Sequence, residues 1–228
     1  NLIKKKKKVI FLTNAPRPCS IVKQYLLNLG MKKNLLKNIM SSGEASMKAL
    51  EKERFGKLFF HLGPNKDNEI FKNIKKNKST IDQCEFILCT GLIEGKEEDL
   101  EYHKNLLKKY ISKKLICTNP DLIVHKGEAT QLCAGTIAKL FESIGGVSVY
   151  FGKPYKEIYK MCFTDKEKVI TIGDNLNTDV RGANNMNIDC IFISNGVHRS
   201  EFKNESELQT LLSKYKVNAN YYQPKLIW

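Results

Sequence analysis

The chain has 228 residues, of which 42% are apolar and 27% are charged. These values lie close to the average of globular proteins, so they exclude a wholly disordered, collagen-like or fibrous chain. No stretch approaches the ~20 uncharged apolar residues that span a bilayer, and the lysine-rich start lacks the apolar segment of a signal peptide. We therefore expect a cytoplasmic globular protein without a membrane partner.

The formal net charge of +14 is of the size found in nucleic-acid binders. Only four of the 38 basic residues are Arg, however, and the lysines are dispersed along the chain. Because Arg makes the bidentate contacts that read guanine and grip phosphate, nucleic-acid surfaces usually carry more of it. We therefore expect no specific nucleic-acid partner and interpret the charge as a lysine-rich compositional bias.

The seven cysteines are scattered, and most lie inside apolar runs. None of them forms a C-x-x-C pair. This pattern argues against a disulfide framework and against a zinc site, and it predicts buried, reduced thiols.

Apolar strand-like runs alternate with helix-like segments, a pattern that predicts an α/β fold with a parallel sheet. The expected strands cover residues 9–12, 57–62, 86–89, 115–117, 147–150, 169–172 and 190–193. The expected helices cover residues 21–29 and 134–144. Several of these strands end in a polar cluster, and the carboxyl edge of such a sheet is where ligands bind.

Asp174 directly follows one of these strands, and Asp179 lies five residues further on, near the start of the next helix. Two carboxylates near one sheet edge suit Mg²⁺, a cation that prefers oxygen ligands and keeps several waters. The alternative is that Asp174 is an ordinary turn residue and Asp179 an acid that the helix dipole stabilises.

Thr13 and Asn14 end the first expected strand. A hydroxyl, an amide and free backbone N–H groups at a helix start form an anion site, although the same residue types favour an ordinary N-cap. Lys153 lies between another strand and a helix that begins near Pro154. Its cation there could neutralise a phosphate or a neighbouring carboxylate.

Taken in order, these elements resemble the motifs of the haloacid dehalogenase (HAD) superfamily, within it the class IIA phosphatase-like hydrolases with a C2-type cap. Further stretches that resemble this branch cover residues 41–45, 118–121 and 133–135. The resemblance implies a Rossmann-like parallel-sheet core formed by residues 1–81 and 151–228, with an α/β cap inserted at residues 82–150.

The resemblance also implies a reaction, the Mg²⁺-dependent hydrolysis of a phosphate monoester through an aspartyl-phosphate intermediate. On the matching positions, Thr13, Lys153 and Asp179 take catalytic roles, and Thr13, Asn14 and Lys153 bind the phosphoryl group. Asp174 is the expected ligand of Mg²⁺ in the intact protein.

The expected substrate is a small phosphorylated metabolite. Arg17 follows Thr13 closely enough to reach a phosphate, while Asn119 and Asp121 lie in the expected cap, where substrate specificity is set. The sequence leaves a homodimer open.

The first motif of the superfamily, Asp-x-Asp at the end of an apolar strand, has no counterpart here. Twelve residues precede Thr13, and none of them is acidic. We therefore expect an N-terminally truncated chain that lacks the central first strand and is inactive for want of the nucleophile. The alternative is a non-catalytic remnant, or a protein that binds a phosphorylated ligand or nucleic acid.

Overall fold

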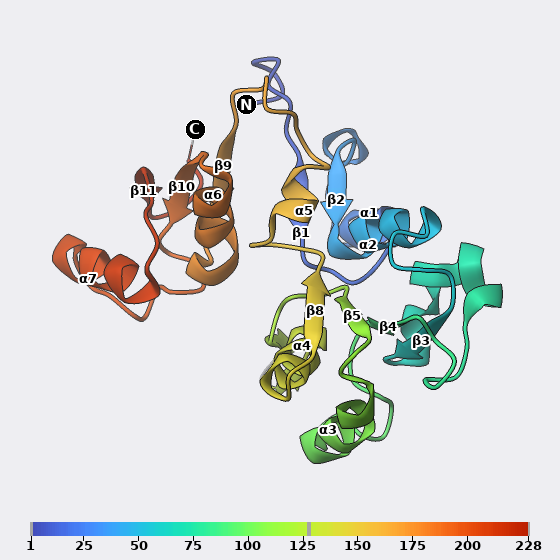
Figure 1. Cartoon of the computed structure of the whole chain (residues 1–228). Helices are drawn as coiled ribbons and strands as arrows, with labels where there is room; N and C mark the ends of the chain where they lie inside the picture. The colour runs from blue at the N-terminus through green and yellow to red at the C-terminus, as the bar shows by residue number, and fades with distance from the viewer. Residues whose placement is uncertain (1, 127–128, 228) are drawn as a thin grey trace. The chain divides into compact units, whose positions relative to one another are not determined.

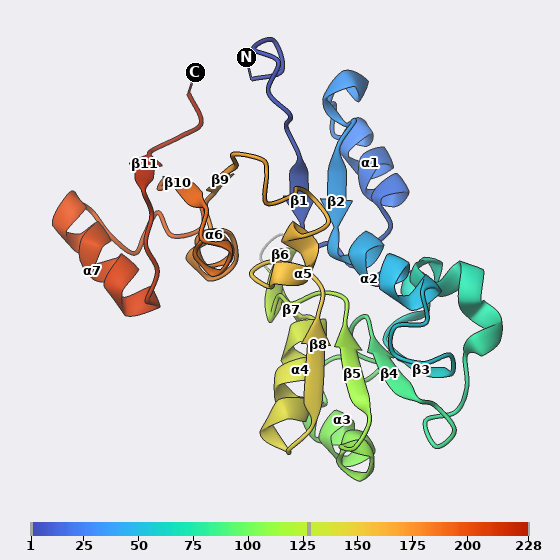
Figure 2. The ribbon, with the colours of Figure 1, turned by 45° about the horizontal axis from the view of Figure 1, so that its top comes forward.

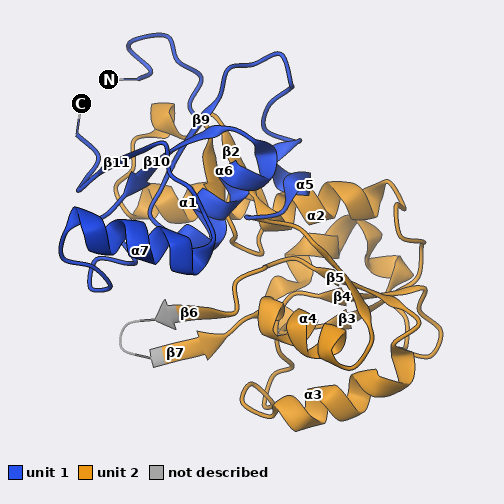
Figure 3. Ribbon diagram, turned by 60° about the vertical axis from the view of Figure 1, so that its left-hand side comes forward, with its two compact units in different colours: residues 1–9, 153–228 blue, residues 10–152 orange. Residues whose placement is uncertain are grey.

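The structure is a computed structural model that describes residues 2–126 and 129–227. The chain divides into two compact units (Figure 3). Unit 1 consists of residues 1–9 and 153–228, and unit 2 consists of residues 10–152.

Unit 2 begins with a two-stranded parallel sheet. Strand β1 (Phe11–Thr13) pairs with β2 (Ile39–Ser41), and helix α1 (Cys19–Asn28) lies between them in the sequence. Helix α2 (Ser42–Glu51) follows β2 without a loop. Among the described residues, β1 has a strand partner on one edge only.

A four-stranded parallel sheet forms the rest of unit 2, with strand order β3-β4-β5-β8 (Figure 2). Its strands are β3 (Phe59–Leu62), β4 (Phe86–Cys89), β5 (Lys114–Cys117) and β8 (Val147–Tyr150). Helices α3 (Leu100–Leu107) and α4 (Ala134–Ser143), three 3-10 segments (Lys33–Leu35, Asn65–Asn77, Lys108–Tyr110) and the antiparallel hairpin β6 (Ile123–Lys126)–β7 (Ala129–Leu132) complete the unit. The two central strands are almost entirely buried, which is why they read as unbroken apolar runs.

Unit 1 contains a three-stranded parallel sheet with the order β11-β10-β9 (Figure 1). The strands are β9 (Ile170–Gly173), β10 (Asp189–Ile193) and β11 (Tyr221–Gln223). The helices are α5 (Lys156–Tyr159), a π-helical turn (Leu176–Val180), α6 (Arg181–Met186) and α7 (Glu205–Tyr215). Leu176, Val180 and Phe192 pack with the buried leucines of α7 to form its core.

Most expected elements are confirmed to within about two residues. The features that were not expected include the strands β2 and β11, the hairpin β6–β7 and the helices α2 and α7. Each three-residue strand among them is defined by its pairing with a neighbour and not by a long apolar run. All seven cysteines are unbridged, as expected, and all but the half-buried Cys19 are buried.

The four-stranded sheet begins before residue 82, the expected start of the inserted cap. Strand β3 hydrogen-bonds to β4 in this sheet, and the boundaries of the compact units fall at 9/10 and 152/153. The division into 1–81, 82–150 and 151–228 therefore stays a prediction. Within the described part of the chain, every helix is too short or too polar to cross a membrane.

Candidate active site

Asp179 holds together the polar end of β9 in unit 1. Its Oδ1 lies 2.6 Å from the Lys153 Nζ. Its Oδ2 accepts hydrogen bonds from the backbone N–H groups of Asp174 and Asn175, at 3.2 and 3.1 Å. The two charged side chains are only 17% (Lys153) and 13% (Asp179) exposed, so the ion pair is partly shielded from water. One carboxylate thus fixes both the ammonium group and the turn that carries Asp174.

Two local features of the sequence allow Asp179 to fold back on this turn. Gly173 ends β9, and a Cβ atom there would overlap the Asp179 side chain. Asn175 accepts a hydrogen bond from the Asn177 N–H at 2.9 Å and so begins the π-helical turn. The motif Gly173-Asp174-Asn175 is therefore a tight strand-to-helix connection built around the Asp179 carboxylate.

Asp174 is held by the loop that follows β10. Its Oδ2 accepts a hydrogen bond from the Val197 N–H at 3.1 Å. A Cβ atom on Gly196 would overlap the Asp174 carboxylate, so a glycine is needed at this position. The Asp174 side chain consequently lies between the carboxyl ends of two neighbouring parallel strands, as its place in the sequence predicted.

His198 is a supporting residue that the sequence did not single out. Its Nε2 accepts a hydrogen bond from the Leu176 N–H at 3.1 Å, and its Nδ1 lies 2.6 Å from Glu201 Oε1. The imidazole is buried and also packs against Tyr215. His198 therefore anchors the turn after Asp174 to the loop that contacts Asp174. The polar cluster at the end of β10 was the only signal in the sequence that pointed to this loop.

A Mg²⁺ site needs several oxygen ligands close together. In residues 2–126 and 129–227, no three His, Cys, Asp or Glu side chains come together as a metal-binding group. Asp174 can supply one carboxylate oxygen, whereas the Asp179 oxygens contact Lys153 and two amides. The described residues therefore do not fit a complete Mg²⁺ site.

In unit 2, Asn14 forms part of a partly buried network with two other predicted site residues. The Asn14 Nδ2 donates to Asp121 Oδ1 at 2.9 Å, and the Asp121 N–H donates to Asn119 Oδ1 at 3.1 Å. Gly152 (φ +132°) approaches this network so closely that a Cβ atom would lie 2.8 Å from Asn14 Oδ1. The structure thus brings these three residues together, and the hydrogen bonds connect the ends of β1 and β5 to each other.

Thr13 and Arg17 line a cavity of about 910 Å³ in unit 2. Asn119 lines the same cavity, as do Pro64 and Thr90, which follow β3 and β4. The hydroxyl of Thr13 accepts a hydrogen bond from the Ala15 N–H at 3.2 Å. The cavity therefore joins the carboxyl end of β1 to the carboxyl ends of the four-stranded sheet.

Comparisons with known proteins agree with this architecture. Residues 150–216 match the HAD-hydrolase-like family. A haloacid dehalogenase-like hydrolase from Brucella suis is 25% identical, with a TM-score of 0.78 over 98% of this chain and 85% of its own. No curated protein matches the chain.

Two phosphatases have the same fold at lower identity. The p-nitrophenyl phosphatase from Archaeoglobus fulgidus is 19% identical (TM-score 0.74; 97% of this chain, 85% of its own). The 4-nitrophenylphosphatase from Thermotoga maritima is 22% identical (TM-score 0.71; 97% and 83%). The HAD-hydrolase-like match of residues 150–216, together with the class IIA-like structural neighbours over nearly the full chain, confirms the resemblance seen in the motifs.

Proposed function

We propose that this protein is a phosphatase of the HAD type that acts on small phosphate monoesters. The observation that carries the proposal is the ion pair of Lys153 with Asp179, fixed at a strand end beside Asp174. A partly buried ammonium group that is oriented by a carboxylate is suited to neutralise charge on a transferring phosphoryl group. The phosphatase structures that share the fold support the same reaction class.

In the proposed reaction each predicted site residue has a separate task. Lys153 contacts a phosphoryl oxygen, and Asp179 holds the ammonium group in place. The Thr13 hydroxyl donates a hydrogen bond to the phosphoryl group, and Asn14 positions the loop after β1 through its bond to Asp121. Asp174 would supply one oxygen ligand if Mg²⁺ were bound, and the metal would neutralise charge on the phosphoryl group.

We further propose that the nucleophile is carried by an apolar strand outside these 228 residues, and that this strand pairs with β1. Two observations favour this. Strand β1 has one partner, β2, among the described residues, so its second edge can accept a strand. In the cavity that β1 lines, the contributing residues of β1 and α1 are mostly apolar, with Leu12, Ile21 and Val22 among them. A strand that filled this edge would pair backbone groups that each cost about 1–3 kcal/mol when buried without partners.

The test compares the 228-residue chain with a chain extended at its N-terminus by an apolar strand that carries Asp-x-Asp. With p-nitrophenyl phosphate and Mg²⁺, we expect turnover from the extended chain only. In the extended chain, Lys153→Ala should lower kcat about 10²-fold or more, the range found when one electrostatic donor is removed. Turnover by the 228-residue chain would contradict its proposed inactivity.

The second candidate is a non-catalytic protein that binds a phosphorylated ligand. It is favoured by the lack of a complete metal-binding group among the described residues. It predicts that the 228-residue chain binds inorganic phosphate, that Lys153→Ala weakens this binding, and that the extended chain has no turnover. Calorimetric titration of both proteins with phosphate, beside the activity assay, distinguishes the two candidates.

A further inference from the structure

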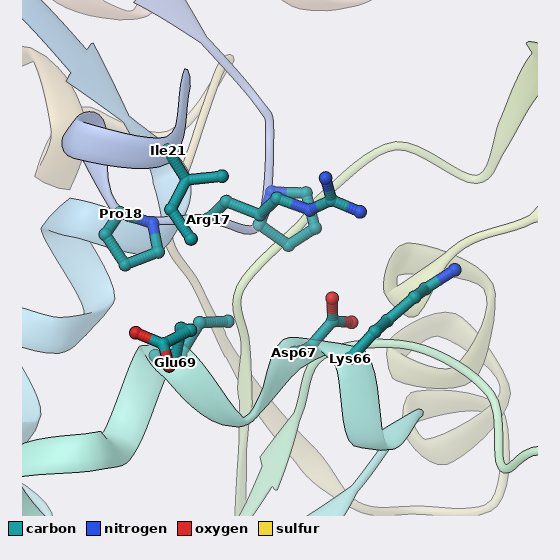
Figure 4. A pocket seen from close by; sticks show the side chains of 8 residues that line it. Arg17, Pro18, Ile21, Lys66, Asp67 and Glu69 are labelled. Atoms are coloured by element: carbon teal, nitrogen blue, oxygen red, sulfur yellow. The ribbon is translucent and has the colours of Figure 1, made fainter. Parts of the chain in front are cut away.

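A second, smaller cavity of unit 2 carries an unusual set of charges. Its volume is about 180 Å³, and its charged lining residues are Arg17, Lys66, Asp67 and Glu69 (Figure 4). Arg17, Lys66 and Asp67 also line the larger cavity, to which Thr13 contributes. The smaller cavity is therefore a side chamber of the space that contains the proposed phosphoryl-binding hydroxyl.

Arg17 is presented to this chamber by a stiff piece of backbone. It stands between Pro16 and Pro18, whose rings fix φ. Its carbonyl accepts a hydrogen bond from the Ser41 hydroxyl at 2.6 Å, and Gly43 packs directly against its backbone. The backbone that carries Arg17 is therefore already fixed, and only the side chain has to be ordered when a ligand binds.

The two cations of the chamber do not form ion pairs with its acidic residues. Among the described residues, neither Arg17 nor Lys66 has a carboxylate within the 4.0 Å of an ion pair. The neighbouring acids have other partners: Glu69 binds Lys72 at 3.0 Å, and Glu94 accepts hydrogen bonds from the N–H and the amide of Asn65. The chamber thus offers two cations, one of them a planar guanidinium group suited to bind a carboxylate with two hydrogen bonds.

Asp67 supplies the complementary acceptor. It is only 4% exposed, and Figure 4 shows its carboxylate among the lining side chains, near Arg17 and Lys66. Burial raises the pKa of this carboxyl group, although Lys66 and Arg17 counteract the shift. The Thr90 hydroxyl also hydrogen-bonds to Asp67 and lies 2.9 Å from His61 Nε2. Burial lowers the pKa of the His61 imidazole to about 4, so this histidine adds no charge at neutral pH.

The size of the chamber limits what it can hold. Its volume of about 180 Å³ suits a small polar group of a ligand. To pair with these lining residues, a ligand needs a carboxylate for Arg17 and Lys66 and a hydrogen-bond donor for Asp67. A three-carbon acid with a hydroxyl or ammonium group on its α-carbon meets both needs within this volume.

We propose that the chamber is a leaving-group subsite that selects phosphate esters of small α-substituted carboxylic acids. The carboxylate binds Arg17 and Lys66, and the α-hydroxyl or α-ammonium group donates to Asp67. The inference rests on the proposed function, because it places the phosphoryl group of the same molecule beside Thr13 in the adjoining cavity.

The test is a calorimetric titration of the 228-residue protein at constant ionic strength with a matched pair of ligands. In 3-phosphoglycerate a carboxylate stands where glycerol 3-phosphate has a neutral CH₂OH group, and the rest of the molecule is the same. We expect 3-phosphoglycerate to bind at least about tenfold more tightly, because hydrogen bonds to charged groups are worth about 1.5–3 kcal/mol. Phosphoserine and 3-phosphonooxypropanoate then show whether an ammonium group, a hydroxyl group or neither satisfies Asp67.

Arg17→Ala should abolish the preference for 3-phosphoglycerate over glycerol 3-phosphate. Arg17→Lys should keep only part of the preference, because it retains the charge and loses the planar fork. Lys75→Ala is the matched control, since Lys75 lies on the same 3-10 segment as Lys66 and lines neither cavity. Equal affinity for the two ligands would overturn the subsite and leave the proposed function standing. Failure of both ligands to bind would overturn the proposed function and the subsite with it.

Discussion

The Asp179 carboxylate divides its two oxygens between different partners, and this division gives the site in unit 1 its shape. One oxygen pairs with the Lys153 ammonium group, and the other accepts from two backbone amides of the turn after β9. The glycine at position 173 makes this approach sterically feasible. A single side chain therefore couples the position of the cation to the position of Asp174.

His61 provides a prediction about the dependence of stability on pH. The pKa of its imidazole falls from 6.5 in the unfolded chain to about 4 in the fold, because burial disfavours the charged form. The unfolded state therefore binds the proton first, and stability that is fully present above pH 6.5 is lost as the pH falls toward 4. Between pH 7 and pH 5, the free energy of unfolding should fall by about 2 kcal/mol more in the native protein than in His61→Gln.

Urea titrations at the two pH values measure this difference. The raised pKa of Asp67 acts in the opposite direction, because the native state takes up that proton first. Asp67 is present in both proteins, so its contribution cancels in the comparison. An equal pH dependence of the two proteins would show that the His61 imidazole is not buried in its neutral form.

His198 provides a second prediction at this scale. Replacing it by Phe keeps an aromatic ring in the core but removes the acceptor of the buried Leu176 N–H. We expect a loss of about 1–3 kcal/mol in the free energy of unfolding, the cost of a buried donor without a partner. Phosphate binding should weaken as well, since the turn that carries Asp174 loses its anchor. Glu201→Gln is the control, because the amide oxygen can still accept from Nδ1; an equal loss there would contradict the argument.

At the scale of elements, the segment 41–45 shows how a family-like motif can be explained by packing. Ser41 caps α2 by accepting the Glu44 N–H at 3.0 Å, and its hydroxyl also donates to the Arg17 carbonyl. The Glu44 carboxylate accepts from the Cys19 N–H at the start of α1, at 3.1 Å. The segment therefore joins the starts of two helices to the loop that presents Arg17.

Gly43 is the position in this segment where a side chain has no room. A Cβ atom there would overlap the backbone of Arg17, which is flanked by prolines and cannot shift easily. We expect Gly43→Ala to lower the free energy of unfolding by about 3 kcal/mol or more. Gly95→Ala is the matched control. It meets no atom within 4 Å and incurs only the strain of its φ of +77°, about 1–2 kcal/mol. Chemical denaturation followed by circular dichroism compares the two, and equal losses would contradict the close-approach argument.

At the scale of the whole molecule, the charge of +14 predicts how the protein responds to salt. Its source is mainly dispersed lysine, so association with nucleic acid should be electrostatic and independent of sequence. In a gel-shift assay with duplex and single-stranded DNA, we expect complexes at low salt that disappear by about 200 mM. A complex that survives this concentration would favour the alternative of a nucleic-acid-binding protein.

The two-unit division also belongs to this scale. Thr13, Asn14, Arg17, Asn119 and Asp121 all lie in unit 2, whereas Lys153, Asp174 and Asp179 lie in unit 1. Each unit by itself arranges its own residues through internal hydrogen bonds. The candidate residues therefore form two groups, each ordered within its own unit.

Features of the fold that depend on local sequence pattern could be predicted from the sequence, whereas features that depend on contacts between distant segments could not. The buried parallel strands β4 and β5 were predictable because burial on both faces demands unbroken apolar runs. The order of the motifs was likewise visible in the sequence and sufficed for the superfamily. Strands β2 and β11 were not predictable, because three residues carry too little pattern and only pairing defines them.

The composition, the reduced cysteines, the main strands and the ordered motif residues were thus determined by local chemistry that one sequence contains. The tertiary structure alone decided that Lys153 pairs with Asp179, 26 residues away, and that Asn14 binds Asp121, 107 residues away. It also decided that Arg17, Lys66 and Asp67 share one chamber. Such contacts join side chains that no periodicity relates, because their distances are set by how strands and loops pack and not by spacing along the chain.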